Sequence, residues 1–172
     1  FNEEENIERL CQEIKREAQS LNYEYEHIVI DNCSTDKTID KLREISSKDK
    51  NIKVIINSKN YGHLKSPYHG ILQSNGDACI LMVSDFQEPI NLISQYIKKW
   101  ENGAKIVLGE KNTTEENNFM FSLRKLFYTT LNKISETKLS INTTGTGLFD
   151  KEVINRLKKI NDPYPYFRGL IS

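Results

Sequence analysis

The hydrophobic positions of this chain repeat with two alternating spacings. Apolar side chains at helical spacing predict helices over 4–21, 34–45, 66–74, 89–101, 118–135 and 151–160. Short apolar runs between them predict strands over 27–31, 52–57, 79–83 and 105–109 and a short strand near Leu148 and Phe149. Because these strands are apolar on both faces and alternate with helices, the pattern is typical of an α/β fold. We expect a mostly parallel sheet flanked by helices on both sides.

Local signals mark the ends of several predicted helices. Ser66 is a candidate N-cap with Pro67 at the first helical position. Asn102-Gly103 is a typical C-terminal stop. Glu88, which precedes Pro89, is interpreted as an acid at the start of a helix.

Polar side chains follow three of the predicted strands. Asp31 and Asn32 stand at the end of one strand. Asp85 follows a second strand and Glu110 a third. A single acid after a strand is an ordinary turn former. Because ligands of parallel α/β sheets bind at the carboxyl ends of the strands, several such residues together predict a site at that edge.

Composition narrows the classes of function. The 172 residues fit one domain with a sizeable core, and the 24 basic and 24 acidic residues give no net charge, which disfavours a nucleic-acid partner. The three cysteines form no CxxC pair, which disfavours a structural zinc site or a disulfide framework and fits a reducing compartment. No apolar run reaches the roughly 20 residues that span a bilayer.

Phosphate-binding glycine motifs are absent. The chain has neither GxGxxG nor GxxxxGK[ST], so a phosphorylated ligand needs another counter-charge. A carboxylate such as Asp85 can lie beside a diphosphate if a divalent cation lies between them, and the Gln87 carbonyl oxygen is a suitable further ligand.

Six blocks of the chain stand in a distinctive order: FNEEENI, VIDNCSTDKT, NYGHLKSPYHGIL, MVSDFQEP, GTGLFDKEVI and YFRGLI. They resemble, over nearly the whole chain, the blocks of family 2 glycosyltransferases with the GT-A fold. The nearest type is the polyprenyl-phosphate sugar transferases, such as dolichol-phosphate mannosyltransferase and bactoprenol glucosyltransferase. The resemblance implies a single GT-A catalytic domain over 1–172. It also implies a first sheet strand before Phe1, and a membrane segment is possible after Ser172.

The resemblance implies a metal site and its ligands. MVSDFQEP resembles the family's metal segment, usually DADLQDPP or VADLQDPP, so Asp85, with Gln87, is expected to hold Mg²⁺ or Mn²⁺ against the donor phosphates. Two departures bear on this site. Val83 replaces the first Asp of the DxD-like motif, and Asn32 replaces the second acid of an Asp pair. A degenerate donor-binding module is therefore an alternative.

The resemblance also implies nucleotide and phosphate contacts. Phe1, Glu3, Asp31 and Asn60 match positions around the nucleotide. Two of them have plainer interpretations, because Asp31 can cap the helix that begins after Ser34 and Glu3 can be a first-turn acid. The expected catalytic residues are Asp85, Gln87, Lys111 and Arg168, the last two as contacts to donor or acceptor phosphate.

The resemblance implies an inverting transfer of a sugar from a nucleotide-diphosphate sugar, with a UDP-sugar as the expected donor, in cell-envelope glycan synthesis. A polyprenyl phosphate acceptor is already ionised and needs no general base, and no obvious base is visible. A growing saccharide, as in capsule or O-antigen synthesis, is the alternative acceptor. The expected place is the cytoplasm, on the cytoplasmic face of the membrane. The basic and aromatic helix over 118–135 can lie on a lipid surface, but the favoured interpretation is a helix with one face in the core and one in water.

Overall fold

The computed structural model describes residues 1–110, 143–160, 162 and 167–171. Its elements, in chain order, are α1 (Ile7–Ser20), β1 (His27–Asp31), α2 (Thr38–Lys48), β2 (Ile52–Ile56), α3 (Gly62–Gln73), β3 (Ala78–Leu81), α4 (Leu92–Glu101), β4 (Ile106–Glu110), β5 (Thr143–Asp150), α6 (Lys151–Leu157) and α7 (Phe167–Leu170). The predicted helix over 118–135 lies outside the described residues. No helix in the described ranges is both long enough and apolar enough to cross a bilayer.

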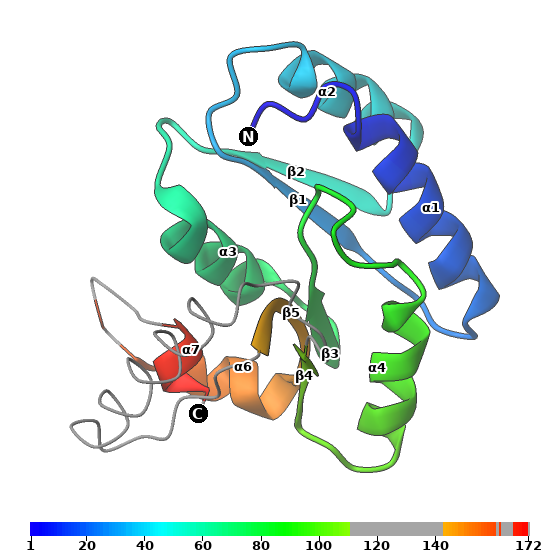
Figure 1. The fold of residues 1–172 in the computed structure, drawn as a ribbon, viewed down its shortest axis with the longest axis vertical. Coiled ribbons are helices and arrows are strands. Elements are labelled where there is room, and N and C mark those ends of the chain that lie inside the picture. Colours follow the sequence, from blue (N-terminus) through cyan, green and yellow to red (C-terminus); the bar gives the residue numbers. More distant parts are fainter. Residues whose placement is uncertain (111–142, 161, 163–166, 172) are drawn as a thin grey trace, which may run out of the picture.

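The described strands form two sheets. β1 and β2 pair in parallel, and β3 and β4 both pair antiparallel with β5, which lies between them. β3 and β4 therefore run in the same direction, and β5 runs against both. The backbone N–H of Asn75, before β3, donates to the Glu26 carboxylate, before β1, at 2.7 Å. The amino ends of these two strands therefore lie together, and their carboxyl ends point to one side of the molecule (Figure 1).

Helices cover both sheets through three buried clusters. The first cluster joins α1 and α2 to β2 through Ile7, Leu10, Cys11, Leu42 and Ile52. The second joins α3, α6 and α7 to β5 through Tyr68, Ile71, Phe149, Ile154, Leu157 and Phe167. The third joins α4 to β4 and β5 through Tyr96, Val107 and Leu148. Since Leu148 and Phe149 are neighbours on β5 and belong to different clusters, the side chains of β5 are buried on both faces, as the sequence predicts.

α3 begins earlier than its sequence signals suggest. It starts at Gly62, so Ser66 is not its N-cap and Pro67 lies inside the helix. The start is held by side-chain acceptors outside the helix, because Asn60 Oδ1 accepts from Gly62 N at 2.8 Å and Asn32 Oδ1 accepts from Tyr61 N at 2.9 Å. These bonds satisfy backbone donors that the first turn of a helix leaves unpaired.

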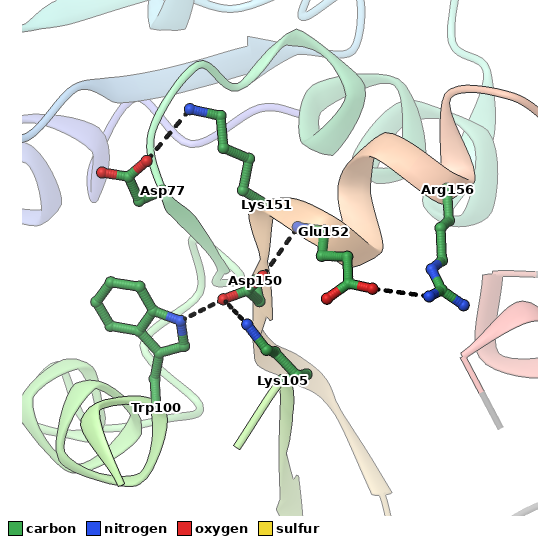
Figure 2. Close-up of polar contacts among 7 residues, drawn as sticks. All are labelled: Asp77, Trp100, Lys105, Asp150, Lys151, Glu152 and Arg156. Atoms are coloured by element: carbon green, nitrogen blue, oxygen red, sulfur yellow. Dashed lines mark hydrogen bonds and ion pairs between the residues drawn. The ribbon is translucent and has the colours of Figure 1, made fainter. Parts of the chain in front are cut away.

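Asp150 joins four elements at the far end of the second sheet, away from the carboxyl ends of β3 and β4 (Figure 2). Its carboxylate accepts from Trp100 Nε1 at 2.8 Å, from Lys105 Nζ at 3.1 Å and from Glu152 N at 2.9 Å. Asp150 is thus the N-cap of α6 and also anchors α4 and the residue that precedes β4. The hydrogen bonds from Trp100 and Glu152 hold the pKa of Asp150 below its ordinary value.

Candidate functional site

The loop that follows β3 presents two polar side chains to solvent. Side-chain exposure alternates along it: Asp85 and Gln87 are exposed, Phe86 is half-buried and Glu88 is buried. Gln87 N donates to Asp85 Oδ1 at 3.1 Å, which closes a tight turn around the carboxylate. The two residues that the sequence predicts as metal ligands therefore face outward from one turn at the carboxyl end of β3.

Phe86 anchors this turn on α1. Its ring packs against the cluster around Ile7 and Leu10, and the Arg9 guanidinium lies 4.7 Å from the ring centre. The backbone of Phe86 has φ 55°, a left-handed conformation that is uncommon for a bulky residue. Such a conformation persists where the surrounding contacts fix it. The packing of Phe86 and the turn around Asp85 are therefore parts of one arrangement.

The first residues of the chain lie against the loop that follows β1. Asn2 N donates to Ser34 Oγ at 2.9 Å, and Glu3 N donates to Thr38 Oγ1 at 2.8 Å. The Glu3 carboxylate accepts from Asn6 Nδ2 at 2.8 Å, while Phe1 is 53% exposed. The structure therefore brings together Phe1, Glu3 and the Asp31 loop, three parts of the predicted nucleotide site.

Asp31 is buried and hydrogen-bonded within its own loop. It is 2% exposed, and its two carboxylate oxygens accept from Ser34 N at 2.9 Å and from Ser34 Oγ at 2.5 Å. Asp31 therefore closes the turn after β1 and does not cap a helix, because α2 begins only at Thr38. The Asp36 carboxylate accepts from Thr38 N, at the first residue of α2, and from Glu4 N, so it ties the start of the chain to this loop. The nucleotide contact of Asp31 stays a prediction.

Asn32 connects this loop to the start of α3. Its amide nitrogen donates to Asn60 Oδ1 at 2.8 Å, and its amide oxygen accepts from Asn57 Nδ2 at 3.1 Å and from Tyr61 N. Asn60, a predicted nucleotide-site residue, is therefore held beside the end of β1. A carboxylate in place of Asn32 could not donate to Asn60, so the amide at this position has a structural use.

These loops lie on one side of the molecule. The turn around Asp85 reaches α1 through Phe86, and the segment leading into α1 is bonded to the loop after β1 (Figure 1). Lys111 lies outside the described residues. Arg168 lies in α7. The preceding residue, Phe167, is buried, and its ring centre lies 5.9 Å from that of Tyr68 on α3. The phosphate-binding roles of Lys111 and Arg168 stay predictions.

Comparison with known proteins identifies the family. Residues 1–158 match the family model described as glycosyl transferase family 2. The chain belongs to glycosyl transferase family 2. This membership confirms the resemblance that the sequence blocks carry, and the α/β fold of the GT-A type is confirmed as well.

Two curated relatives and one solved structure illustrate the likeness. The chain is 30% identical to the uncharacterized glycosyltransferase YkcC of Bacillus subtilis, over 100% of this chain and 54% of that protein. It is 27% identical to the bactoprenol glucosyl transferase of Shigella phage SfX, over 100% of this chain and 57% of that protein. The chain thus spans about half the length of these relatives. A mannosyltransferase of Pyrobaculum calidifontis, in complex with GDP-Man and Mn²⁺, matches with a TM-score of 0.53 and 14% identity, over 87% of this chain and 43% of that one.

The residues at this turn suit a hard divalent cation. The carboxylate of Asp85 and the amide oxygen of Gln87 are oxygen donors on one exposed turn. Mg²⁺ is commonly held by one or two carboxylates together with substrate phosphates and water. The described residues contain no cluster of three or more His, Cys, Asp or Glu side chains that could hold a metal by themselves. The set at Asp85 therefore fits a metal that the donor helps to bind.

Sequence reasoning missed the place of Glu88 in this loop. α4 begins at Leu92, and Glu88 is a buried acid that accepts a hydrogen bond from Thr146 Oγ1 of β5, so it is not a helix-start acid. No local pattern signals this contact, because Thr146 lies 58 residues further along the chain.

A depression elsewhere in the molecule is separate from this site. It has a volume of about 260 Å³ and lies between the start of β3 and α6, lined by Ser74, Asn75, Gly76, Lys151, Ile154, Asn155 and Lys158. Asp85 follows the opposite end of β3, so the depression does not belong to the candidate site.

Proposed function

We propose that this family 2 glycosyltransferase moves one sugar from a UDP-sugar to a polyprenyl phosphate, with inversion at the anomeric carbon. The proposed setting is cell-envelope glycan synthesis at the cytoplasmic face of the membrane. One observation carries the donor side of the proposal: Asp85 and Gln87 both face outward from the fixed turn after β3. The name of the bactoprenol glucosyl transferase relative supports the lipid-phosphate acceptor.

The chain's own residues would bind and orient the donor. Asp85 and Gln87 would hold Mg²⁺ or Mn²⁺, which supplies positive charge beside the donor diphosphate when it is bound. Phe1, Glu3 and Asn60 lie around the loops after β1 and β2, where the nucleoside would be placed. Lys111 and Arg168 would add positive charge near the donor or acceptor phosphates.

The transfer itself needs no proton acceptor from the protein. An ionised phosphate oxygen of the lipid attacks the anomeric carbon from the face opposite the diphosphate. The new carbon–oxygen bond forms as the bond to the diphosphate breaks, and the nucleoside diphosphate leaves with the bonding electrons. A hydroxyl acceptor would have to lose a proton to a base. Glu88, the next acid after Asp85, is buried and is hydrogen-bonded to Thr146, which favours the phosphate acceptor.

The test uses the full-length protein with Mn²⁺, undecaprenyl phosphate and a panel of radiolabelled UDP- and GDP-sugars. We expect one UDP-sugar to give labelled lipid, and Asp85→Asn to lower kcat/KM by about 10²-fold or more. Asp40→Asn, which changes an exposed acid on α2, is the matched control and should keep wild-type turnover. Absence of labelled lipid with every donor would refute the lipid-phosphate acceptor, and transfer to a saccharide instead would support the alternative acceptor.

A further inference from the structure

Glu88 is a buried carboxylate without a cationic partner among the described residues. It is 8% exposed, and none of the ion pairs within the described ranges includes it. Burying a carboxylate is unfavourable unless hydrogen bonds satisfy it. The contacts of Glu88 are therefore a feature that needs a structural explanation.

A chain of hydroxyl groups leads to this carboxylate. Thr146 Oγ1 donates to Glu88 Oε2, and the Tyr96 and Thr144 hydroxyl oxygens each lie 3.0 Å from Thr146 Oγ1. Each hydroxyl carries one proton and two acceptor positions. Because the Thr146 proton is directed to Glu88, Tyr96 and Thr144 can both donate to Thr146. Desolvation raises the pKa of Tyr96, which keeps its hydroxyl protonated and able to donate.

Gly109 leaves the space that this cluster needs. A Cβ atom at position 109 would lie 2.5 Å from Thr144 Oγ1, 2.6 Å from Tyr96 Oη and 3.0 Å from Thr146 Oγ1. Any larger residue would therefore push the hydroxyl groups apart. The backbone of β4, the ring of Tyr96 on α4 and two threonines of β5 meet at one point, and Glu88 brings the loop after β3 to that point.

The loop that carries the proposed metal ligands is thus fixed at two places. Phe86 packs on α1, and Glu88 is hydrogen-bonded to β5. Gln87 lies between these two residues and Asp85 precedes them, and both side chains face outward. We infer that Glu88 is a positioning residue: its hydrogen bond to Thr146 fixes the loop so that Asp85 and Gln87 face the donor diphosphate. This inference rests on the proposed function. It assigns to Glu88, Thr146 and Tyr96 a role in donor binding without contact to the donor.

The test measures UDP binding by calorimetry in saturating Mn²⁺, with the full-length protein, together with the thermal unfolding midpoint of each variant. Thr146→Val removes the donated proton at nearly constant shape, and Thr146→Ser restores it. Ser74→Ala is the matched control, because it removes another buried hydroxyl, bonded to Ile71 O at 2.7 Å, at the amino end of β3.

We expect Thr146→Val to weaken UDP binding by about tenfold or more, Thr146→Ser to stay within about threefold of wild type, and Ser74→Ala to leave UDP affinity unchanged. If Thr146→Val does not fold, Tyr96→Phe replaces it, with an expected loss of about threefold. Equal UDP affinity in wild type and in the folded Thr146 or Tyr96 variant would overturn the positioning role while leaving the proposed function intact. Absence of UDP binding by the wild-type protein would overturn both.

Discussion

Asn32 illustrates how a single side-chain amide can hold two loops together. Its amide nitrogen donates to Asn60, and its amide oxygen accepts from Asn57 and from Tyr61 N. We expect Asn32→Asp to lower the free energy of unfolding by about 1–3 kcal/mol, because the new oxygen would face Asn60 Oδ1 without a proton between them. Urea denaturation measures the change.

Asn51→Asp is the control for this prediction. Asn51 is an exposed residue just before β2, so the same amide-to-carboxylate change there should alter the free energy of unfolding by less than about 0.5 kcal/mol. Equal stability of Asn32→Asp and wild type would show that Asn60 can reorient without loss, and that the amide at position 32 is not needed for the loop.

His27 makes stability depend on pH. Desolvation lowers the pKa of His27 to about 4, from an ordinary value near 6.5. The folded protein therefore keeps the imidazole neutral, while the unfolded chain binds a proton below about pH 6.5. The free energy of unfolding should fall as pH drops from about 6.5 to about 4, by at most about 1.4 kcal/mol per pH unit. Urea denaturation across this range measures the slope, and His27→Gln should reduce it. An unchanged slope in His27→Gln would assign the pH dependence to other groups.

At the scale of elements, Asp150 supports the start of α6 and the end of α4 (Figure 2). Asp150→Ala removes the N-cap bond to Glu152 N and leaves Trp100 Nε1 without its acceptor. We expect a loss of about 1–2 kcal/mol in the free energy of unfolding, measured by urea denaturation. Because hydrogen bonds lower the pKa of Asp150, its contribution is present above its ordinary pKa of about 4 and is lost as pH falls through its lowered pKa.

Glu152→Ala tests the specificity of the Asp150 prediction. The Glu152 carboxylate pairs with Arg156 at 2.7 Å on the exposed face of α6, and such exposed pairs contribute little. This variant should lose less than about 0.5 kcal/mol. A similar loss in both variants would mean that the Asp150 contacts do not stabilise the junction.

The sequence predicted those elements whose formation depends on residues close together in the chain. The apolar runs located β1 to β4 to within a few residues, because the buried strands carry their hydrophobic side chains consecutively. The start of α3 escaped prediction although Asn60, one of its acceptors, lies two residues before Gly62, and the other acceptor, Asn32, comes from a distant part of the chain. The burial of Glu88 escaped prediction because Thr146 lies on another strand. The position of Asp85 and Gln87 after β3 was predictable because the end of a buried strand is visible in the sequence, while the contacts that fix their loop come from α1 and β5.

At the scale of the whole molecule, β1 and β3 each have one edge without a partner strand within the described residues. β1 pairs with β2 on one edge and β3 pairs with β5 on one edge, and no ladder joins β1 to β3. α3 nevertheless packs on both β1 and β3, and the Glu26–Asn75 bond ties their amino ends together. Unpaired backbone groups in such a place are unfavourable unless another strand or water satisfies them.

We therefore expect the backbone amides of β1 and β3 that face this gap to exchange with solvent faster than the amides of the same strands that pair with β2 and β5. Ladder hydrogen bonds protect an amide from exchange, so the difference should be at least about tenfold. Hydrogen exchange of residues 1–172 measures it, and the amides of β5, which pairs on both edges, are the control. Equal protection of both sets of amides in β1 and β3 would show that the facing edges are paired.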